Sequence, residues 1–138
     1  AVKAGKRALE IFESGVCCSE AVVYAIAETK ELGNAILYTK MSSGLCGGMG
    51  LELACGVLTG GACAIGLYLG RNSLEEVPAV KCSTISKHFA AAFTEHYSAS
   101  NCSDLKAQAP NPAQSRPYCK AIVEWGTAKV AEIINQNI

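Results

Sequence analysis

Cysteine is the residue type in this chain whose number and placement suggest chemistry. The chain has eight cysteines in 138 residues. A cysteine thiolate attacks disulfides and binds metal ions, so these residues are candidates for redox exchange or metal ligation. No two of them are spaced as Cys-x-x-Cys, and neither a thioredoxin-type dithiol nor the usual zinc pairing is present locally. Any site must therefore be assembled from cysteines that lie far apart in the sequence.

Four cysteines share one expected setting, the start of a helix. Asn101 is a good N-cap residue, and Pro117 favours the first turn of a helix. A thiol at a helix N-terminus faces unpaired N–H groups and the positive end of the helix dipole, which lower its pKa from about 8.5. We therefore predict reactive thiols at Cys18, Cys55, Cys102 and Cys119. The alternative is that these small apolar side chains only pack.

The other four cysteines are expected to be packing residues, although Cys46 could also approach a site through the glycine-rich loop. They are Cys17, Cys46, Cys63 and Cys82. Cys63 follows Cys55 by eight residues on the same predicted helix. That spacing corresponds to about 12 Å along the helix axis, so these two thiols cannot bond directly. Cys17 is the last of the four to exclude, because it adjoins Cys18 and either thiol of that pair could be the reactive one.

The elements that must position these thiols are predicted to be helices. Apolar residues recur at helical spacing over residues 2–13, 18–30, 54–69 and 81–97, and again from near residue 119 onward. No strand-like alternation competes with this pattern. We therefore predict an all-α fold, a compact array of about five helices around a glycine-rich central helix.

Two other segments are less regular. Residues 34–43 are ambiguous, although another short helix is an option there. Residues 98–118 are polar and contain three prolines, so they are expected to be mostly loop. The glycine-rich segment 44–50 lacks a nucleotide-binding fingerprint, and we interpret it as a tight turn before the central helix.

The central helix raises the question of a membrane span. The segment Leu53–Gly70 has 18 residues and none of them is charged. This length is close to that of a membrane-spanning helix. However, it contains five glycines and is bracketed by Glu52 and Arg71. Small residues let neighbouring helices approach closely, so a buried helix is the preferred interpretation.

Composition excludes several classes of function. Twelve basic and twelve acidic residues leave no net charge, and no run of either sign suggests nucleic-acid binding. Half of the residues are hydrophobic, which favours one folded domain over residues 1–138. The first residues lack the hydrophobic core of a secretory signal, so we expect a reducing, cytoplasmic location.

Several segments together resemble one known family. They are Gly15–Ala21, Gly47–Met49, Cys55–Gly60, Asn101–Leu105 and the helix at Cys119. In this combination the chain resembles the C_GCAxxG_C_C family of redox proteins, defined by four cysteines and a Cys-Gly-Ala-x-x-Gly motif. The resemblance implies that Cys18, Cys55, Cys102 and Cys119 are the redox cysteines. Here Val57 replaces the alanine of the motif, and Cys17 stands where the family commonly has asparagine.

Three functional hypotheses follow. The leading one is thiol–disulfide exchange, with Cys18 or Cys55 attacking an oxidised partner protein and a second cysteine resolving the mixed disulfide. Cys102 and Cys119 could form one pair, but the four cysteines allow three connectivities. The second is a four-cysteine iron–sulfur or metal centre for electron transfer, with the same four residues as ligands. The third is a non-catalytic helical interaction protein, and a homodimer remains an option in each case.

Overall fold

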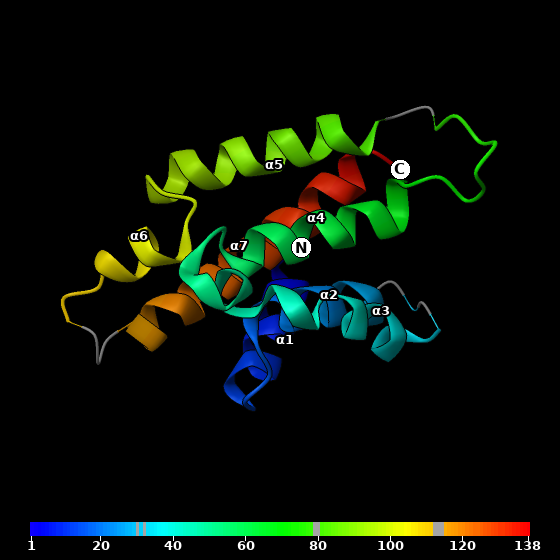
Figure 1. The fold of residues 1–138 in the computed structure, drawn as a ribbon. Helices are drawn as coiled ribbons and strands as arrows, with labels where there is room; N and C mark the ends of the chain where they lie inside the picture. The colour runs from blue at the N-terminus through cyan, green and yellow to red at the C-terminus, as the bar shows by residue number, and fades with distance from the viewer. Residues whose placement is uncertain (30, 32, 79–80, 112–114) are drawn as a thin grey trace.

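The computed structural model describes residues 1–29, 31, 33–78, 81–111 and 115–138, and within them the fold is all-α (Figure 1). Seven α-helices follow one another along these ranges: α1 (Val2–Glu13), α2 (Cys18–Thr29), α3 (Ala35–Met41), α4 (Gly56–Leu69), α5 (Cys82–Tyr97), α6 (Cys102–Ala107) and α7 (Ser115–Gln136). Two short helical turns, η1 (Ser43–Leu45) and η2 (Gly48–Glu52), lie between α3 and α4. The prediction of an all-α fold is therefore confirmed for these residues.

The longer helices lie where their apolar spacing places them, whereas the short ones add to the predicted five. Helix α3 falls in the ambiguous segment, and α6 falls in the segment that was expected to be mostly loop. Helix α7 begins at Ser115, so Pro117 lies within its first turn. The first-turn N–H groups have no partner inside the helix, and proline is therefore tolerated there.

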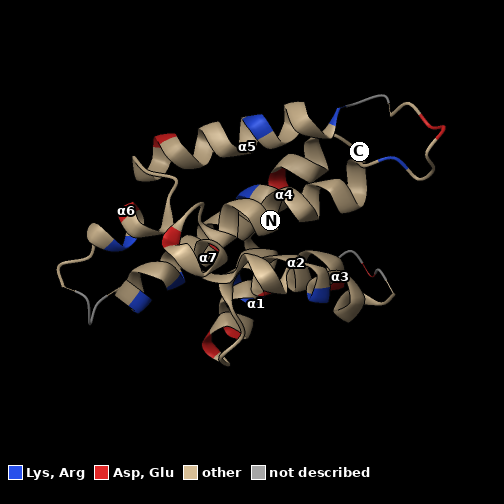
Figure 2. Cartoon of the chain, in the orientation of Figure 1, with Lys and Arg blue, Asp and Glu red and all other residues tan. Residues whose placement is uncertain are grey.

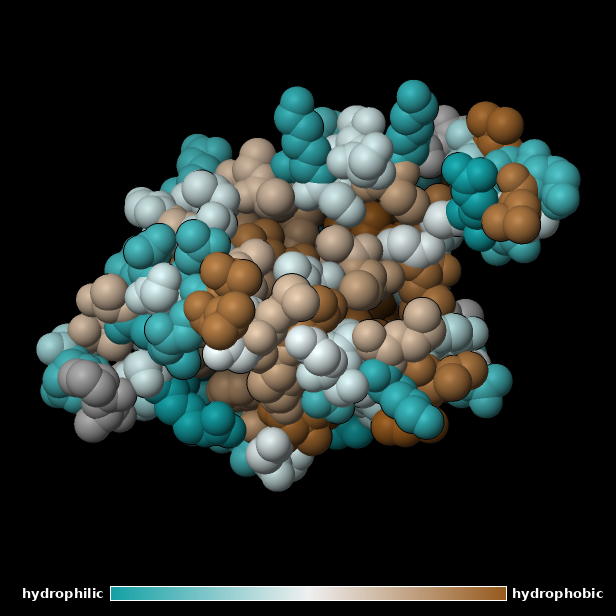
Figure 3. Space-filling view, viewed as in Figure 1, coloured by the Kyte–Doolittle hydropathy of each residue, from teal (hydrophilic) through white to brown (hydrophobic). Residues whose placement is uncertain are grey.

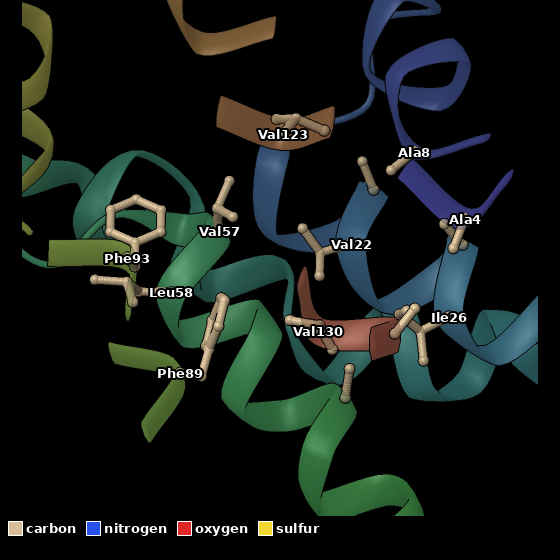
Figure 4. Packing of buried hydrophobic residues seen from close by; sticks show 14 of the residues in the cluster. Ala4, Ala8, Val22, Ile26, Val57, Leu58, Phe89, Phe93, Val123 and Val130 are labelled. Atoms are coloured by element: carbon tan, nitrogen blue, oxygen red, sulfur yellow. The ribbon is translucent and has the colours of Figure 1, made fainter. Parts of the chain in front are cut away.

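Helix α7 is the longest element, and it packs along α1 and also contacts α4 and α2. Helix α4 packs between α2 and α5 in Figure 1, and α2 also packs against α1 and α3. Figure 4 shows the core where these helices meet. Val22, Val57 and Val123 point into it from three helices, and each is at most 1% exposed.

The glycines of α4 allow this close packing at two helix contacts. A Cβ at Gly60 would lie 2.7 Å from the backbone oxygen of Ser19 in α2. A Cβ at Gly61 would lie 2.5 Å from the ring of Phe89 in α5. The predicted role of small residues in helix contact is thus confirmed at these positions. It is not confirmed at Gly66, where a Cβ would meet open space.

Surface chemistry follows the balanced composition. Basic and acidic residues are scattered over the elements in Figure 2 without a patch of one sign on the visible face. Exposed apolar side chains lie on α3, on η2 and on the loop after α4, and they form separate brown areas in Figure 3. In the described ranges, no helix has both the length and the apolar character that crossing a bilayer requires.

Candidate thiol site

Two of the predicted cysteines are placed side by side by a small backbone bridge. Residue Ala54 pairs with Asn101 in an isolated antiparallel bridge. The N–H of Cys55 donates to the carbonyl of Ser100 at 2.9 Å, and the N–H of Cys102 donates to the carbonyl of Leu53 at 2.6 Å. Since Cys55 immediately precedes α4 and Cys102 is the first residue of α6, the bridge fixes the starts of these two helices together.

The other two predicted cysteines come from α2 and α7. Cys18 is the first residue of α2, as predicted. The prediction that Cys119 lies at a helix start was wrong. Helix α7 begins four residues earlier, at Ser115, so this thiol lies in its second turn. Asn101 does precede α6, but its side chain makes no capping hydrogen bond.

All four predicted thiols line one small pocket of about 30 Å³. Apart from the four sulfurs and Lys106, the pocket is lined by apolar side chains and by Gly56. Cys55 and Cys102 are 7% and 9% exposed, whereas Cys18 and Cys119 are half-buried. The structure therefore brings together cysteines as far apart in the sequence as Cys18 and Cys119.

The first glycine of the motif is required by this assembly. A Cβ at Gly56 would lie 2.5 Å from the sulfur of Cys18 and 3.3 Å from Cβ of Ser19. With Gly60 against Ser19 one turn later, α4 rests directly on the first turn of α2. The spacing of these two glycines thus brings the helix starts of Cys18 and Cys55 into contact.

The pKa values of Cys18 and Cys55 are shifted in the direction opposite to the prediction. Burial raises the pKa of Cys18, although the backbone N–H groups of Gly47 and Ser19 donate to its sulfur and act to lower it. Burial likewise raises the pKa of Cys55 to about 12, against the N–H groups of Val57 and Leu58. Desolvation of a thiolate here outweighs the helix N-terminus, so both groups are neutral thiols at neutral pH.

Cys119 has a different electrostatic environment. Burial and the neighbouring thiolates of Cys102 and Cys18 raise its pKa, while the charges of Lys106 and Arg116 lower it. Lys106 is also paired with Glu52 at 3.3 Å. Arg116 donates to the carbonyl of Phe12 at 3.0 Å and lies over its ring. Lys106 and Arg116 are thus the two cations that stabilise a thiolate at Cys119.

A cysteine pair that the sequence analysis treated as packing residues lies next to this site. Cys17 and Cys46 form a disulfide, with their Cα atoms 5.9 Å apart. The assignment of these two residues to packing was therefore wrong. The available signal was Cys17 itself, which stands beside Cys18 at a position where asparagine is common in the family. The partner could not be inferred, because Cys46 is separated from it by 29 residues.

The glycine-rich segment brings Cys46 back to the start of α2. Gly47, Gly48 and Gly50 have positive φ values of 60°, 62° and 74°. At Gly48 a Cβ would also lie 2.7 Å from the backbone oxygen of Leu53. The predicted tight turn is confirmed, and its function is to return the chain across the N-terminus of α2.

The remaining cysteines and the other pockets lie elsewhere. Cys63 is exposed on α4, and Cys82 is half-buried at the start of α5; neither lines the thiol pocket. A larger pocket of about 730 Å³ lies between α1 and α2, but it contains no thiol, and its Arg7 is paired with Glu28 at 2.6 Å.

The predicted metal centre was tested against the side-chain arrangement. In the part of the chain that the structure describes, no three His, Cys, Asp or Glu side chains are grouped so that they could hold one metal ion. The four thiols line one pocket, but as placed they do not fit a four-thiolate centre. We therefore derive no step through such a centre.

The fold is all-α, and it gathers four dispersed cysteines around one small pocket, three of them at or directly before a helix start, which is the arrangement of a small helical protein with a thiol site. Within this class the chain belongs to the family described as "Putative redox-active protein (C_GCAxxG_C_C)", which matches residues 16–133. The match covers all four cysteines and the glycine motif, so the resemblance found in the sequence is confirmed. Comparison with curated proteins and with solved structures gives no match.

Proposed function

We propose that this protein is a thiol–disulfide redox protein whose working thiols are Cys18, Cys55, Cys102 and Cys119. The observation that carries the proposal is their convergence on one pocket from four different elements. Electrostatic interactions couple Cys18 with Cys55 and Cys102, and couple Cys119 with both Cys18 and Cys102. Their shared pocket is what supports exchange of a disulfide from one of these thiols to another.

Cys18 is the best-placed attacking group of the four. It is half-buried, so a partner can reach it, and three backbone N–H groups stabilise its thiolate. Cys55 is a poorer attacking group because burial raises its pKa to about 12. Of the two cysteines predicted as the attacking thiol, we therefore propose Cys18.

The proposed reaction is a two-step exchange. The Cys18 thiolate attacks one sulfur of a partner disulfide, a mixed disulfide forms, and the other partner sulfur leaves as a thiolate that takes up a proton. A second cysteine of the pocket then attacks the Cys18 sulfur. An intramolecular disulfide forms, and the partner leaves fully reduced. Two electrons and two protons pass from the pocket thiols to the partner.

The experiment is a thiol count in a variant that lacks the Cys17–Cys46 pair. In the Cys17→Ser/Cys46→Ser protein, six cysteines remain. We expect a mild disulfide-forming oxidant to consume two or four thiols, with peptide mapping placing the new bonds among the four pocket cysteines. Adding Cys63→Ser and Cys82→Ser should leave this result unchanged. An unchanged count, or bonds only at Cys63 and Cys82, would support a non-catalytic helical protein instead.

The metal hypothesis is separated by a second measurement on the same protein. Anaerobically purified protein should be colourless and should carry no stoichiometric iron or zinc. Visible absorption that depends on Cys18, Cys55, Cys102 and Cys119 would instead favour a cluster. A cytoplasmic location, a redox partner protein and a homodimer all stay predictions from the sequence.

A further inference from the structure

The Cys17–Cys46 disulfide and three of the working thiols share a second, more open pocket. This pocket has a volume of about 370 Å³ and is lined by both half-cystines together with Cys18, Cys102 and Cys119. The small thiol pocket adjoins it through the same three cysteines. The disulfide therefore lies in the space through which the working thiols are reached.

We propose that Cys17–Cys46 is the solvent-facing member of a disulfide relay, which exchanges its bond through Cys18 with the buried thiol of Cys102. The proposal rests on the proposed function and adds a second route to it, in which a partner exchanges with Cys17–Cys46 instead of with Cys18. It also assigns a direction to the exchange, from an exposed pair to a buried pair.

Exposure falls in order along this route. Cys46 is exposed, Cys17 and Cys18 are half-buried, and Cys102 is only 9% exposed. A partner protein can therefore approach Cys46 directly, whereas Cys102 is far less accessible to it. An exposed disulfide is also the kind that exchanges readily, whereas a buried one resists reduction.

Chain connectivity keeps Cys18 next to this disulfide. Cys17 immediately precedes Cys18, and Gly47 immediately follows Cys46. The N–H of Gly47 donates to the sulfur of Cys18, so the turn that carries Cys46 lies against the attacking group. Since Cys17 and Cys18 are consecutive and the Cys46 turn lies against Cys18, the relay has Cys18 attack the sulfur of Cys46.

Both steps of the relay balance within the chain. The Cys18 thiolate attacks the sulfur of Cys46; the Cys18–Cys46 bond forms, the Cys17–Cys46 bond breaks, and Cys17 leaves as a thiolate that is protonated. The Cys102 thiolate then attacks the sulfur of Cys18, and Cys46 leaves and is protonated. The thiols of Cys18 and Cys102 are oxidised, and those of Cys17 and Cys46 are reduced. No external oxidant takes part in this transfer.

The test follows the location of the disulfide with time in the full chain. Reduced protein is treated with one equivalent of diamide at about pH 5, where exchange is slow, and is then brought to about pH 9, where thiolates form. Samples are quenched with acid and N-ethylmaleimide, and the linked peptides are mapped by mass spectrometry. We expect Cys17–Cys46 to appear first and Cys18–Cys102 to replace it.

Two single variants mark the steps. With Cys18→Ser, the Cys17–Cys46 bond should persist after the pH change. With Cys102→Ser, a Cys18–Cys46 bond should accumulate, because the second step is blocked. Cys63→Ser/Cys82→Ser serves as the matched control and should behave like the unaltered chain. Circular dichroism of each variant checks that the helices are intact.

The relay is overturned if Cys17–Cys46 remains the sole disulfide of the unaltered chain at about pH 9. The Cys17→Ser/Cys46→Ser variant then shows which proposal has failed. If it forms Cys18–Cys102 on oxidation, only the relay is wrong, and Cys17–Cys46 is a structural crosslink. If it forms no disulfide among the pocket cysteines, the proposed function fails as well.

Discussion

Gly56 lies directly against the sulfur of Cys18, so that a Cβ at position 56 would come within 2.5 Å of it. This relationship joins the glycine of the motif on α4 to the proposed attacking thiol on α2. The motif glycine is therefore a packing requirement of the thiol site, and its removal should alter both stability and thiol reactivity.

Substitution Gly56→Ala should lower the free energy of unfolding by about 1–3 kcal/mol, because the added methyl group must displace the Cys18 sulfur or the helix itself. Denaturant unfolding of the reduced protein measures this change. Gly66→Ala is the matched control on the same helix, since a Cβ there meets nothing within 4 Å. It should stabilise the helix by about 0.5–1 kcal/mol. Equal effects of the two substitutions would contradict the close contact at Gly56.

The alkylation rate of Cys18 should keep rising with pH beyond the range of an ordinary thiol. Its pKa is raised by burial, so the thiolate fraction at neutral pH is below that of an exposed cysteine. We expect a rise of about tenfold per pH unit from pH 7 to 9, with no plateau near pH 9. Site-resolved alkylation with mass spectrometry measures this, and a small free thiol such as glutathione in the same buffer provides the comparison. A plateau of the alkylation rate below pH 8 would show that the helix N-terminus lowers the pKa of Cys18 by more than burial raises it.

Stability of the reduced protein should fall in alkaline solution because of Cys55. Its pKa is raised to about 12 in the folded state, so between its unfolded pKa of about 8.5 and that value the folded protein binds the proton more tightly. The stability contributed by this group is complete below the unfolded pKa and is lost as the pH rises toward the folded one. The expected slope is about 1.4 kcal/mol per pH unit. Cys55→Ser should reduce this slope, and an identical slope would contradict a buried neutral thiol.

Reactivity of Cys119 should depend on two cations. The charges of Lys106 and Arg116 lower its pKa against the effect of burial. Lys106→Gln together with Arg116→Gln should therefore slow its alkylation at neutral pH by about two- to fivefold, and less at high salt. Lys129→Gln on the same helix is the control, because Lys129 pairs with Glu132 and lies outside both thiol pockets. If Cys119 is alkylated at the same rate in the double variant and in the Lys129→Gln control, the two cations have no electrostatic effect on this thiol.

The sequence by itself determined the local features of this protein. The apolar spacing in the sequence predicted the bounds of α1 and α5 to within one residue. Helical periodicity depends only on residues that are near one another in the sequence. The four cysteines and the glycine motif were sufficient to identify the family. The start of α2 at Cys18 and that of α4 directly after Cys55 could also be predicted, since a glycine stop marks the first and an apolar run marks the second.

Tertiary structure decided the rest. The Cys17–Cys46 bond depends on how the glycine turn returns over α2, and no local pattern encodes that distance. The start of α7 was misplaced because proline fits anywhere in a first turn, so Pro117 did not fix it. The direction of the thiol pKa shifts was also misjudged, because a helix start is a local feature whereas burial depends on every element packed around the sulfur. The sequence thus singled out the four cysteines that line one pocket, and only the packed helices determined their protonation and their neighbouring disulfide.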